Sequence, residues 1–164
     1  FALSALLYGA ASVTGIEQSE DAIAVAERNR ALNGLAGAVE WRCGNAFDVL
    51  RDLEREGRRY DVVVMDPPPF APSKDRIDSA RRGYKDLALR AFRLLDNRGA
   101  LLFLSCSHAF GRDILLDTLG EAARDAKRRI VVAGEIHQPA DHPRVPEIPE
   151  TDYLKGFLCA VDSN

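Results

Sequence analysis

The sequence YDVVVM at residues 60–65, followed directly by DPPPF at residues 66–70, decides the fold. A continuous apolar run rich in β-branched residues predicts a strand that is buried on both faces of a parallel sheet. The three prolines must end this strand, because proline has no N–H to donate to a neighbouring strand. We therefore expect a parallel sheet in which this strand ends at a rigid corner.

Strand and helix patterns alternate on both sides of this stretch, with short connections between them. The predicted strands cover residues 12–17, 39–43, 100–105, 129–136 and 153–161, and the predicted helices cover 1–11, 19–34, 47–56, 84–95 and 113–127. This alternation predicts an α/β fold with a doubly wound, mostly parallel sheet. The last two strands have no helix between them, so we expect the last strand to be antiparallel.

Length and composition predict a soluble protein with a single domain over residues 1–164. The 164 residues are 46% hydrophobic and 29% charged, and their longest apolar runs fall far short of the roughly 20 residues that span a bilayer. The net charge is −3, from 22 Lys and Arg against 25 Asp and Glu. This balance excludes binding to nucleic acid through bulk charge, but it leaves room for a local basic patch.

Three cysteines, Cys43, Cys106 and Cys159, lie far apart without any spacing typical of metal ligands. Neither a disulfide framework nor a metal site is predicted, and we expect a reducing, cytoplasmic location. Cys43 and Cys159 fall within strand patterns and are expected in the core. The chain opens inside the helix pattern at 1–11 without a capping residue, so we expect a domain that is truncated at its N-terminus.

Ligands of an open parallel sheet bind beyond the carboxyl ends of its strands, which directs attention to the residues that end each strand. An acid such as Glu17 at this place is typical of a residue that binds the two hydroxyls of a ribose. The alternative is a carboxylate that is favoured only by the helix N-terminus behind it. Asn45 is weaker evidence, because Gly-Asn is also an ordinary turn pair.

Two further strand ends carry groups that could bind a ligand or take part in a reaction. Asp66 and Phe70 frame the prolines and would flank a slot for a flat polar ring, although a purely structural corner is the alternative. Cys106 lies between two serines at the end of the strand over 100–105. A thiol there is either a nucleophile or a packed side chain, and its position alone leaves both interpretations open.

A basic segment follows the proline corner. Residues 74–93 hold seven basic and three acidic side chains, within a chain of net charge −3. Charge of this kind is common on a solvated helix face, but next to a slot for a flat ring it also suggests contacts to phosphates. The basic residues are Lys74, Arg76, Arg81, Arg82, Lys85, Arg90 and Arg93.

On these motifs the sequence resembles the class I S-adenosylmethionine-dependent methyltransferases. Within that class it resembles the large-subunit ribosomal RNA cytosine-5 methyltransferases, which usually carry an N-terminal PUA domain. The resemblance is carried by GAASVTGIE at 9–17, NRALNG at 29–34, the stretch at 60–70, RGYKDL at 82–87, SCS at 105–107, DHP at 141–143 and PETDYLKG at 149–156. The family has Asp where this chain has Asn45. The family's first strand and Gly-rich turn, which precede the helix that begins near Phe1, are expected to be missing from this chain.

The resemblance implies methyl transfer from S-adenosyl-L-methionine to carbon 5 of a cytosine in ribosomal RNA, with Cys106 as the nucleophile and Asp66 as its catalytic partner. The cofactor-binding residues expected on this basis are Glu17, Gln18, Asn45, Ala46, Asp66 and Pro67. The proline corner and the basic segment add the expected substrate-binding residues Pro68, Phe70, Lys74, Arg81 and Arg82. No metal and no membrane are expected, and a homodimer is left open. The alternatives are methylation of an exocyclic base amine at the proline corner and a non-catalytic binding module.

Overall fold

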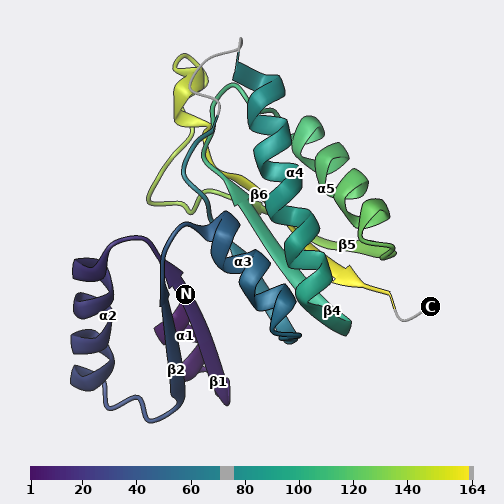
Figure 1. The fold of residues 1–164 in the computed structure, drawn as a ribbon. Coiled ribbons are helices and arrows are strands. Elements are labelled where there is room, and N and C mark those ends of the chain that lie inside the picture. The colour runs from purple at the N-terminus through teal and green to yellow at the C-terminus, as the bar shows by residue number, and fades with distance from the viewer. Residues whose placement is uncertain (71–75, 163–164) are drawn as a thin grey trace. The chain divides into compact units, whose positions relative to one another are not determined.

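The structure is a computed structural model that describes residues 1–70 and 76–162. The chain forms two compact units, residues 1–53 and residues 54–164, which both combine strands with helices (Figure 1). In the described part of the chain, no helix is long and apolar enough to cross a membrane.

The first unit is built on two parallel strands. Its elements are α1 (Ala2–Leu7), β1 (Ser12–Glu17), α2 (Glu20–Leu32) and β2 (Ala38–Cys43), and α3 (Ala46–Arg55) begins within it. The strands β1 and β2 pair in register, so that both end at the same edge of the sheet. As the sequence predicts, α2 begins at a cap, where the Ser19 hydroxyl accepts a hydrogen bond from the Ala22 N–H at 3.2 Å.

The second unit holds a four-stranded sheet in the order β3-β4-β6-β5. Its elements are β3 (Tyr60–Met65), α4 (Ile77–Leu94), β4 (Leu95–Ser105), α5 (Arg112–Asp125), β5 (Ile130–His137), a short 3-10 helix (Pro149–Thr151) and β6 (Lys155–Val161). The pair β3 and β4 is parallel, whereas β6 lies antiparallel between β4 and β5. The predicted α/β fold and its antiparallel last strand are therefore confirmed.

The hydrophobic core of the second unit lies between its sheet and two helices. In Figure 1, α4 and α5 lie side by side over one face of the sheet, and both contact its strands. Fully buried aromatic and aliphatic side chains from all of these layers fill the space between them. They include Tyr84, Leu87, Phe92, Leu101, Phe103, Phe110, Leu115, Leu119 and Phe157.

Three expectations drawn from the sequence are wrong in detail. The strand β3 is not buried on both faces, because it pairs only with β4 in the described sheet and Val62 is 60% exposed. Cys43 is exposed rather than in the core, since it is the last residue of β2 in a sheet of two strands. The helix α4 begins at Ile77 rather than near residue 84, because Ala80, Tyr84 and Leu87 pack into the core from one helix face.

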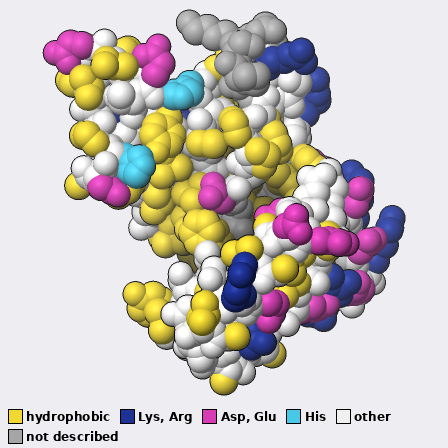
Figure 2. All heavy atoms as spheres, turned by 90° about the vertical axis from the view of Figure 1, so that its left-hand side faces the viewer, with side chains coloured by type: hydrophobic (Ala, Val, Ile, Leu, Met, Phe, Trp, Pro, Cys, Tyr) yellow, Lys and Arg dark blue, Asp and Glu magenta, His cyan; other side chains and the backbone are white. Residues whose placement is uncertain are grey.

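Some large hydrophobic side chains stay exposed in both units, and Figure 2 shows hydrophobic side chains spread over the face that it presents. No residue of α2 is buried. The most exposed of the large hydrophobic side chains are Phe1, Leu7, Tyr8, Leu32 and Val62. The core of this chain therefore lies chiefly in the second unit.

Candidate active site

In the first unit, the predicted ribose-binding acid and the turn after β2 lie at one edge of the sheet. Glu17 is opposite Cys43 in the parallel register, and the Gly44 N–H donates to the Glu17 backbone oxygen at 3.0 Å. Glu17 and the turn that holds Asn45 and Ala46 are thus neighbours. This is the arrangement that the sequence predicts for two strand ends of a parallel pair.

The Glu17 side chain has one oxygen engaged by backbone donors. Its Oε1 accepts hydrogen bonds from the N–H groups of Gln18, at 2.7 Å, and Ser19, at 2.9 Å. These bonds fix the carboxylate in front of α2, as the helix N-terminus favours. No described residue donates a hydrogen bond to its Oε2, so the residues present fit a ligand hydroxyl at that oxygen. This geometry is therefore compatible with both interpretations of Glu17: one carboxylate oxygen is held at the start of α2, and the other is left for a ligand hydroxyl.

Asn45 has a role in the chain's own structure. Its Oδ1 accepts a hydrogen bond from the Phe47 N–H at 2.9 Å, and its backbone oxygen accepts from Asp48 and Val49 at the start of α3. Asn45 therefore caps α3, which begins at Ala46. Its contact with an adenine, like the contacts predicted for Gln18 and Ala46, stays a prediction.

In the second unit, the proline corner and the cysteine turn follow neighbouring parallel strands. Asp66 follows Met65 at the end of β3, and Cys106 follows Ser105 at the end of β4. Both side chains therefore lie at the same edge of the sheet. Asp66 is exposed and Cys106 is half-buried.

A buried tyrosine links the proline corner to the cysteine turn. The hydroxyl of Tyr84 on α4 lies 3.3 Å from the Phe70 N–H, 3.1 Å from the Ser105 Oγ and 2.7 Å from the Ser107 Oγ. Tyr84 and both serines are at most 1% exposed. The residues on either side of Cys106 are thus held by one hydroxyl group.

The directions of these hydrogen bonds follow from the number of hydrogen bonds that each group can donate and accept. The Tyr84 oxygen accepts from the Phe70 N–H and from the Ser105 hydroxyl, so its single proton is donated to the Ser107 Oγ. The Ser105 Oγ in turn accepts from the Ser107 N–H at 3.3 Å. Such a satisfied buried network favours one conformation of the turn.

A lysine approaches the same turn from β6. The Nζ of Lys155 donates to the backbone oxygens of Ser107, at 2.7 Å, and Tyr153, at 3.0 Å. Lys155 is 7% exposed and stands opposite Ser105 in the antiparallel pairing of β4 with β6. The cysteine turn is therefore fixed by α4 on one side and by β6 on the other.

A family model described as "Methyltransferase domain" matches residues 1–143. The chain belongs to this methyltransferase domain family. It is 41% identical over 162 residues to the "Ribosomal RNA large subunit methyltransferase I" of Klebsiella pneumoniae, covering 98% of this chain and 40% of that protein. The chain thus spans about 40% of the length of the curated relatives that it matches.

Solved structures share the fold of this methyltransferase domain at low sequence identity. SMU.776, a protein assigned as a methyltransferase and crystallised with SAH, matches with a TM-score of 0.84 and 19% identity over 97% of this chain and 41% of that one. TrmN from Thermus thermophilus matches with a TM-score of 0.65 and 16% identity over 98% of this chain and 40% of that one. At these identities the likeness shows the fold alone.

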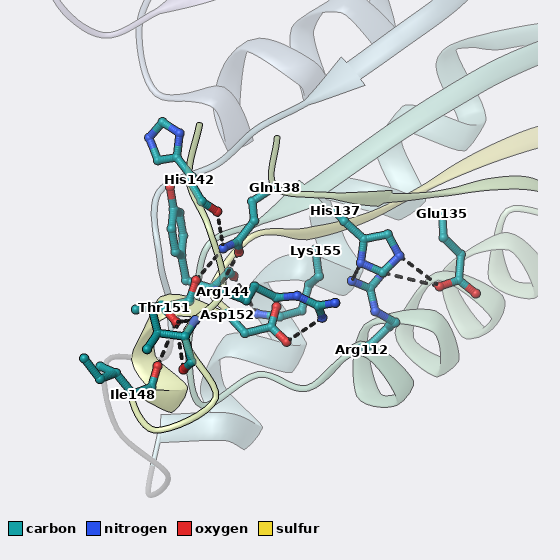
Figure 3. A network of polar contacts seen from close by, with 12 residues as sticks. Arg112, Glu135, His137, Gln138, His142, Arg144, Ile148, Thr151, Asp152 and Lys155 are labelled. Atoms are coloured by element: carbon teal, nitrogen blue, oxygen red, sulfur yellow. Dashed lines mark hydrogen bonds and ion pairs between the residues drawn. The ribbon is translucent and has the colours of Figure 1, made fainter. Parts of the chain in front are cut away.

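A loop of the methyltransferase domain between β5 and β6 is tied together by one glutamine (Figure 3). The Nε2 of Gln138 donates to the backbone oxygens of His142 and Thr151, and its Oε1 accepts from the Tyr153 N–H at 3.2 Å. Arg144 and Asp152 add an ion pair at 3.2 Å. These contacts anchor the segment that leads into Lys155.

The ring of Phe70 packs against the network rather than standing free. It stacks on Tyr84 with ring centroids 4.8 Å apart and an interplanar angle of 27°. Tyr84 also makes edge contacts with Phe103 and Phe110. Tyr84 thus covers one face of Phe70, and the contact of Phe70 with a base stays a prediction.

The basic residues after the corner are largely paired with acids. Arg81 contacts Glu121 at 2.6 Å, and Lys85 contacts Glu121 and Asp125 at 3.4 and 2.9 Å. Arg82 is exposed, and Lys74 lies outside the described residues. Ion pairs between α4 and α5 therefore neutralise part of the positive charge that the sequence predicts for contacts with RNA phosphates.

The sequence motifs did not assign a role to the residues that hold the cysteine turn. Tyr84 and Lys155 fall within RGYKDL and PETDYLKG, which indicate a family resemblance but no function for either side chain. A signal was present in the two serines that flank Cys106, since buried hydroxyl groups need partners. No cluster of three or more metal-ligating side chains occurs in residues 1–70 and 76–162.

Proposed function

We propose that this chain is the catalytic part of a methyltransferase that methylates carbon 5 of a cytosine in ribosomal RNA, with Cys106 as the nucleophile. The observation that carries the proposal is the position of Cys106, half-buried at the end of β4 and held between two hydrogen-bonded serines at the edge that also bears Asp66. The name of the relatives that are about 40% identical supports ribosomal RNA as the substrate.

S-adenosyl-L-methionine is the proposed cofactor, and it supplies an electrophilic methyl group when it is bound. Glu17 and Gln18 would hold its ribose, Asn45 and Ala46 its adenine, and Asp66 and Pro67 its methionine portion. The open Oε2 of Glu17 supports this assignment, because a carboxylate oxygen is a strong acceptor for a ribose hydroxyl.

Carbon 5 of cytosine is a poor nucleophile, which explains the need for a cysteine. Addition of the Cys106 thiolate to carbon 6 turns the ring into an enamine that can take the methyl group at carbon 5. A base then takes the carbon 5 proton. The electron pair of that C–H bond restores the double bond between carbons 5 and 6, and Cys106 leaves as a thiolate. Asp66 is assigned the role of holding the ring by hydrogen bonds, so that charge developing on it is stabilised.

An RNA that contains 5-fluorocytosine tests the covalent step. Fluorine at carbon 5 cannot leave as a proton does, so the chain is expected to stay linked to the RNA through Cys106. The measurement is a cofactor-dependent adduct that resists denaturing electrophoresis, with the same RNA containing cytosine as the control. No adduct at any concentration of active protein would contradict the cysteine mechanism.

The position of the transferred label decides between the two enzyme mechanisms. With a labelled methyl donor, the label is expected on carbon 5 of the cytosine after digestion to nucleosides. Label on a base nitrogen would instead support methylation of an exocyclic amine, with the Asp66 carboxylate and a proline carbonyl accepting the amine hydrogens.

The further expectations of one catalytic domain over residues 1–164, a cytoplasmic location and a homodimer stay predictions.

RNA affinity should depend on the basic segment, with Pro68 and Phe70 next to the base. Replacing Arg81 and Arg82 together by glutamine is expected to lower RNA affinity and to flatten the plot of log affinity against log salt by about 0.7–0.9 for each phosphate that is no longer bound. Affinity for S-adenosylhomocysteine should not change. The matched single variants separate Arg81, which also contacts Glu121, from the exposed Arg82. An unchanged slope in both would assign the segment to a solvated helix face.

A further inference from the structure

We propose that Lys155 is a positioning residue for Cys106: its ammonium group holds the turn that carries the sulfur, and its positive charge stabilises the thiolate. The inference rests on the proposed function, in which Cys106 must add to a base as a thiolate. It assigns a role in the reaction to a lysine on β6, a strand that carries no other residue of the proposed site.

The strand pairing brings Lys155 to the cysteine turn. Lys155 is opposite Ser105, the residue before Cys106, and its Nζ donates to the backbone oxygen of Ser107, the residue after it. At Gly156 a Cβ would meet the Phe103 backbone oxygen at 2.6 Å. The absence of a side chain there lets β6 lie close to β4 and fixes the lysine at this place.

The partners of this buried ammonium are unusual. Among the described residues, no carboxylate forms an ion pair with the Lys155 Nζ, whose hydrogen bonds go to two backbone oxygens. A buried ammonium that lacks a negative partner is costly, because it loses the hydration of its charge. A thiolate on Cys106 would offset this cost. Cys106 and Asp152 are the negative groups that act on this ammonium, and of the two only Cys106 belongs to the turn that Lys155 holds.

Burial and the charges around Lys155 together lower its pKa, although two negative groups partly oppose this. Burial lowers the pKa of Lys155 and the positive charge of Arg112 lowers it further, whereas negative charges on Cys106 and Asp152 raise it. Arg112 lies at the start of α5 and itself contacts Glu135 on β5.

The test measures the reactivity of the Cys106 thiol, which does not require methyl transfer. In a chain carrying Cys43→Ser, the rate of alkylation by iodoacetamide is followed against pH for the parent and for Lys155→Met. The remaining Cys159 is fully buried, and burial raises its pKa to about 11. Removal of the positive charge is expected to raise the pH midpoint of alkylation by about one unit, so that the rate at pH 7 falls about ten-fold.

Two further variants separate charge from packing. Lys155→Arg keeps the charge and should restore a midpoint close to that of the parent, while Lys127→Met removes an exposed lysine charge and should leave the midpoint unchanged. A purely structural role would alter the rate at all pH values without moving the midpoint. An unmoved midpoint in Lys155→Met, or an arginine variant that behaves like the methionine variant, would overturn the inference.

A reciprocal measurement keeps the inference testable even if Lys155→Met does not fold. In a chain with ¹³C-labelled lysine, Cys106→Ser removes the thiolate and should lower the pKa of Lys155, followed by NMR of its Cε. An unchanged Lys155 pKa would refute the pairing. The proposed function could fail while this inference holds. In that case Lys155→Met would still shift the pH midpoint of alkylation, but the parent chain would form no adduct with 5-fluorocytosine RNA.

Discussion

Replacement of Cys106 by alanine is expected to abolish methylation of carbon 5, with a loss of rate on the order of 10³-fold or more. The reason is chemical: without addition of sulfur at carbon 6, carbon 5 of cytosine has too little electron density to attack a methyl group. The side chain is half-buried at the end of β4, and a single thiol is removed, so its truncation should leave the fold intact. The measurement is single-turnover transfer of a labelled methyl group to ribosomal RNA.

The controls for this variant are a substitution at Cys43 and the affinity for S-adenosylhomocysteine. Cys43→Ala removes an exposed thiol and should keep full activity. Calorimetry with S-adenosylhomocysteine should give the same affinity for Cys106→Ala as for the parent. Full activity of the alanine variant with intact folding would exclude the cysteine mechanism and favour methylation of an amine at the Asp66 corner.

The sequence predicted best what depends on local chemistry and on the geometry of parallel strands. The bounds of β1 and β3 agree with the prediction, and Ser19 caps α2 as expected. Asp66 and Cys106 were assigned to one sheet edge because the carboxyl ends of neighbouring parallel strands lie together. These inferences need only residue patterns over a few positions.

The residues that hold the nucleophile depend on contacts between distant parts of the chain. Tyr84 lies in a stretch of charged residues, and only the packing of α4 on the sheet shows that it is buried. Lys155 would be assigned to solvent by its residue type, and only the register of β6 against β4 brings it to Ser105. The ion pair of Arg81 with Glu121 likewise depends on how α4 and α5 pack.

The buried strand and the buried Cys43 were predicted wrongly for one physical reason. Burial of a strand depends on its neighbours in the sheet, and a hydrophobic run does not say how many neighbours it has. In the described structure β3 pairs with β4 alone, and β2 pairs with β1 alone. Their side chains are consequently more exposed than the residue pattern indicates.

The second large effect is expected for Tyr84→Phe, which removes a single oxygen from the core. The Phe70 N–H, the Ser105 hydroxyl and the Ser107 Oγ are each deprived of their hydrogen bond to that oxygen. Both serines are at most 1% exposed, so water cannot simply replace the missing partner. We expect the free energy of unfolding to fall by about 2–4 kcal/mol, measured by urea denaturation followed by circular dichroism.

The matched control is Tyr8→Phe, which removes the same atom from a side chain that is 88% exposed. It should change the free energy of unfolding by less than about 0.5 kcal/mol. Under conditions where Tyr84→Phe remains folded, release of the turn should also lower the rate of adduct formation with 5-fluorocytosine RNA, whereas affinity for S-adenosylhomocysteine stays close to that of the parent. A Tyr84→Phe chain as stable and as reactive as the parent would show that the hydroxyl network does not hold the cysteine turn, and would leave the hydrogen bond from Lys155 to Ser107 as its principal support.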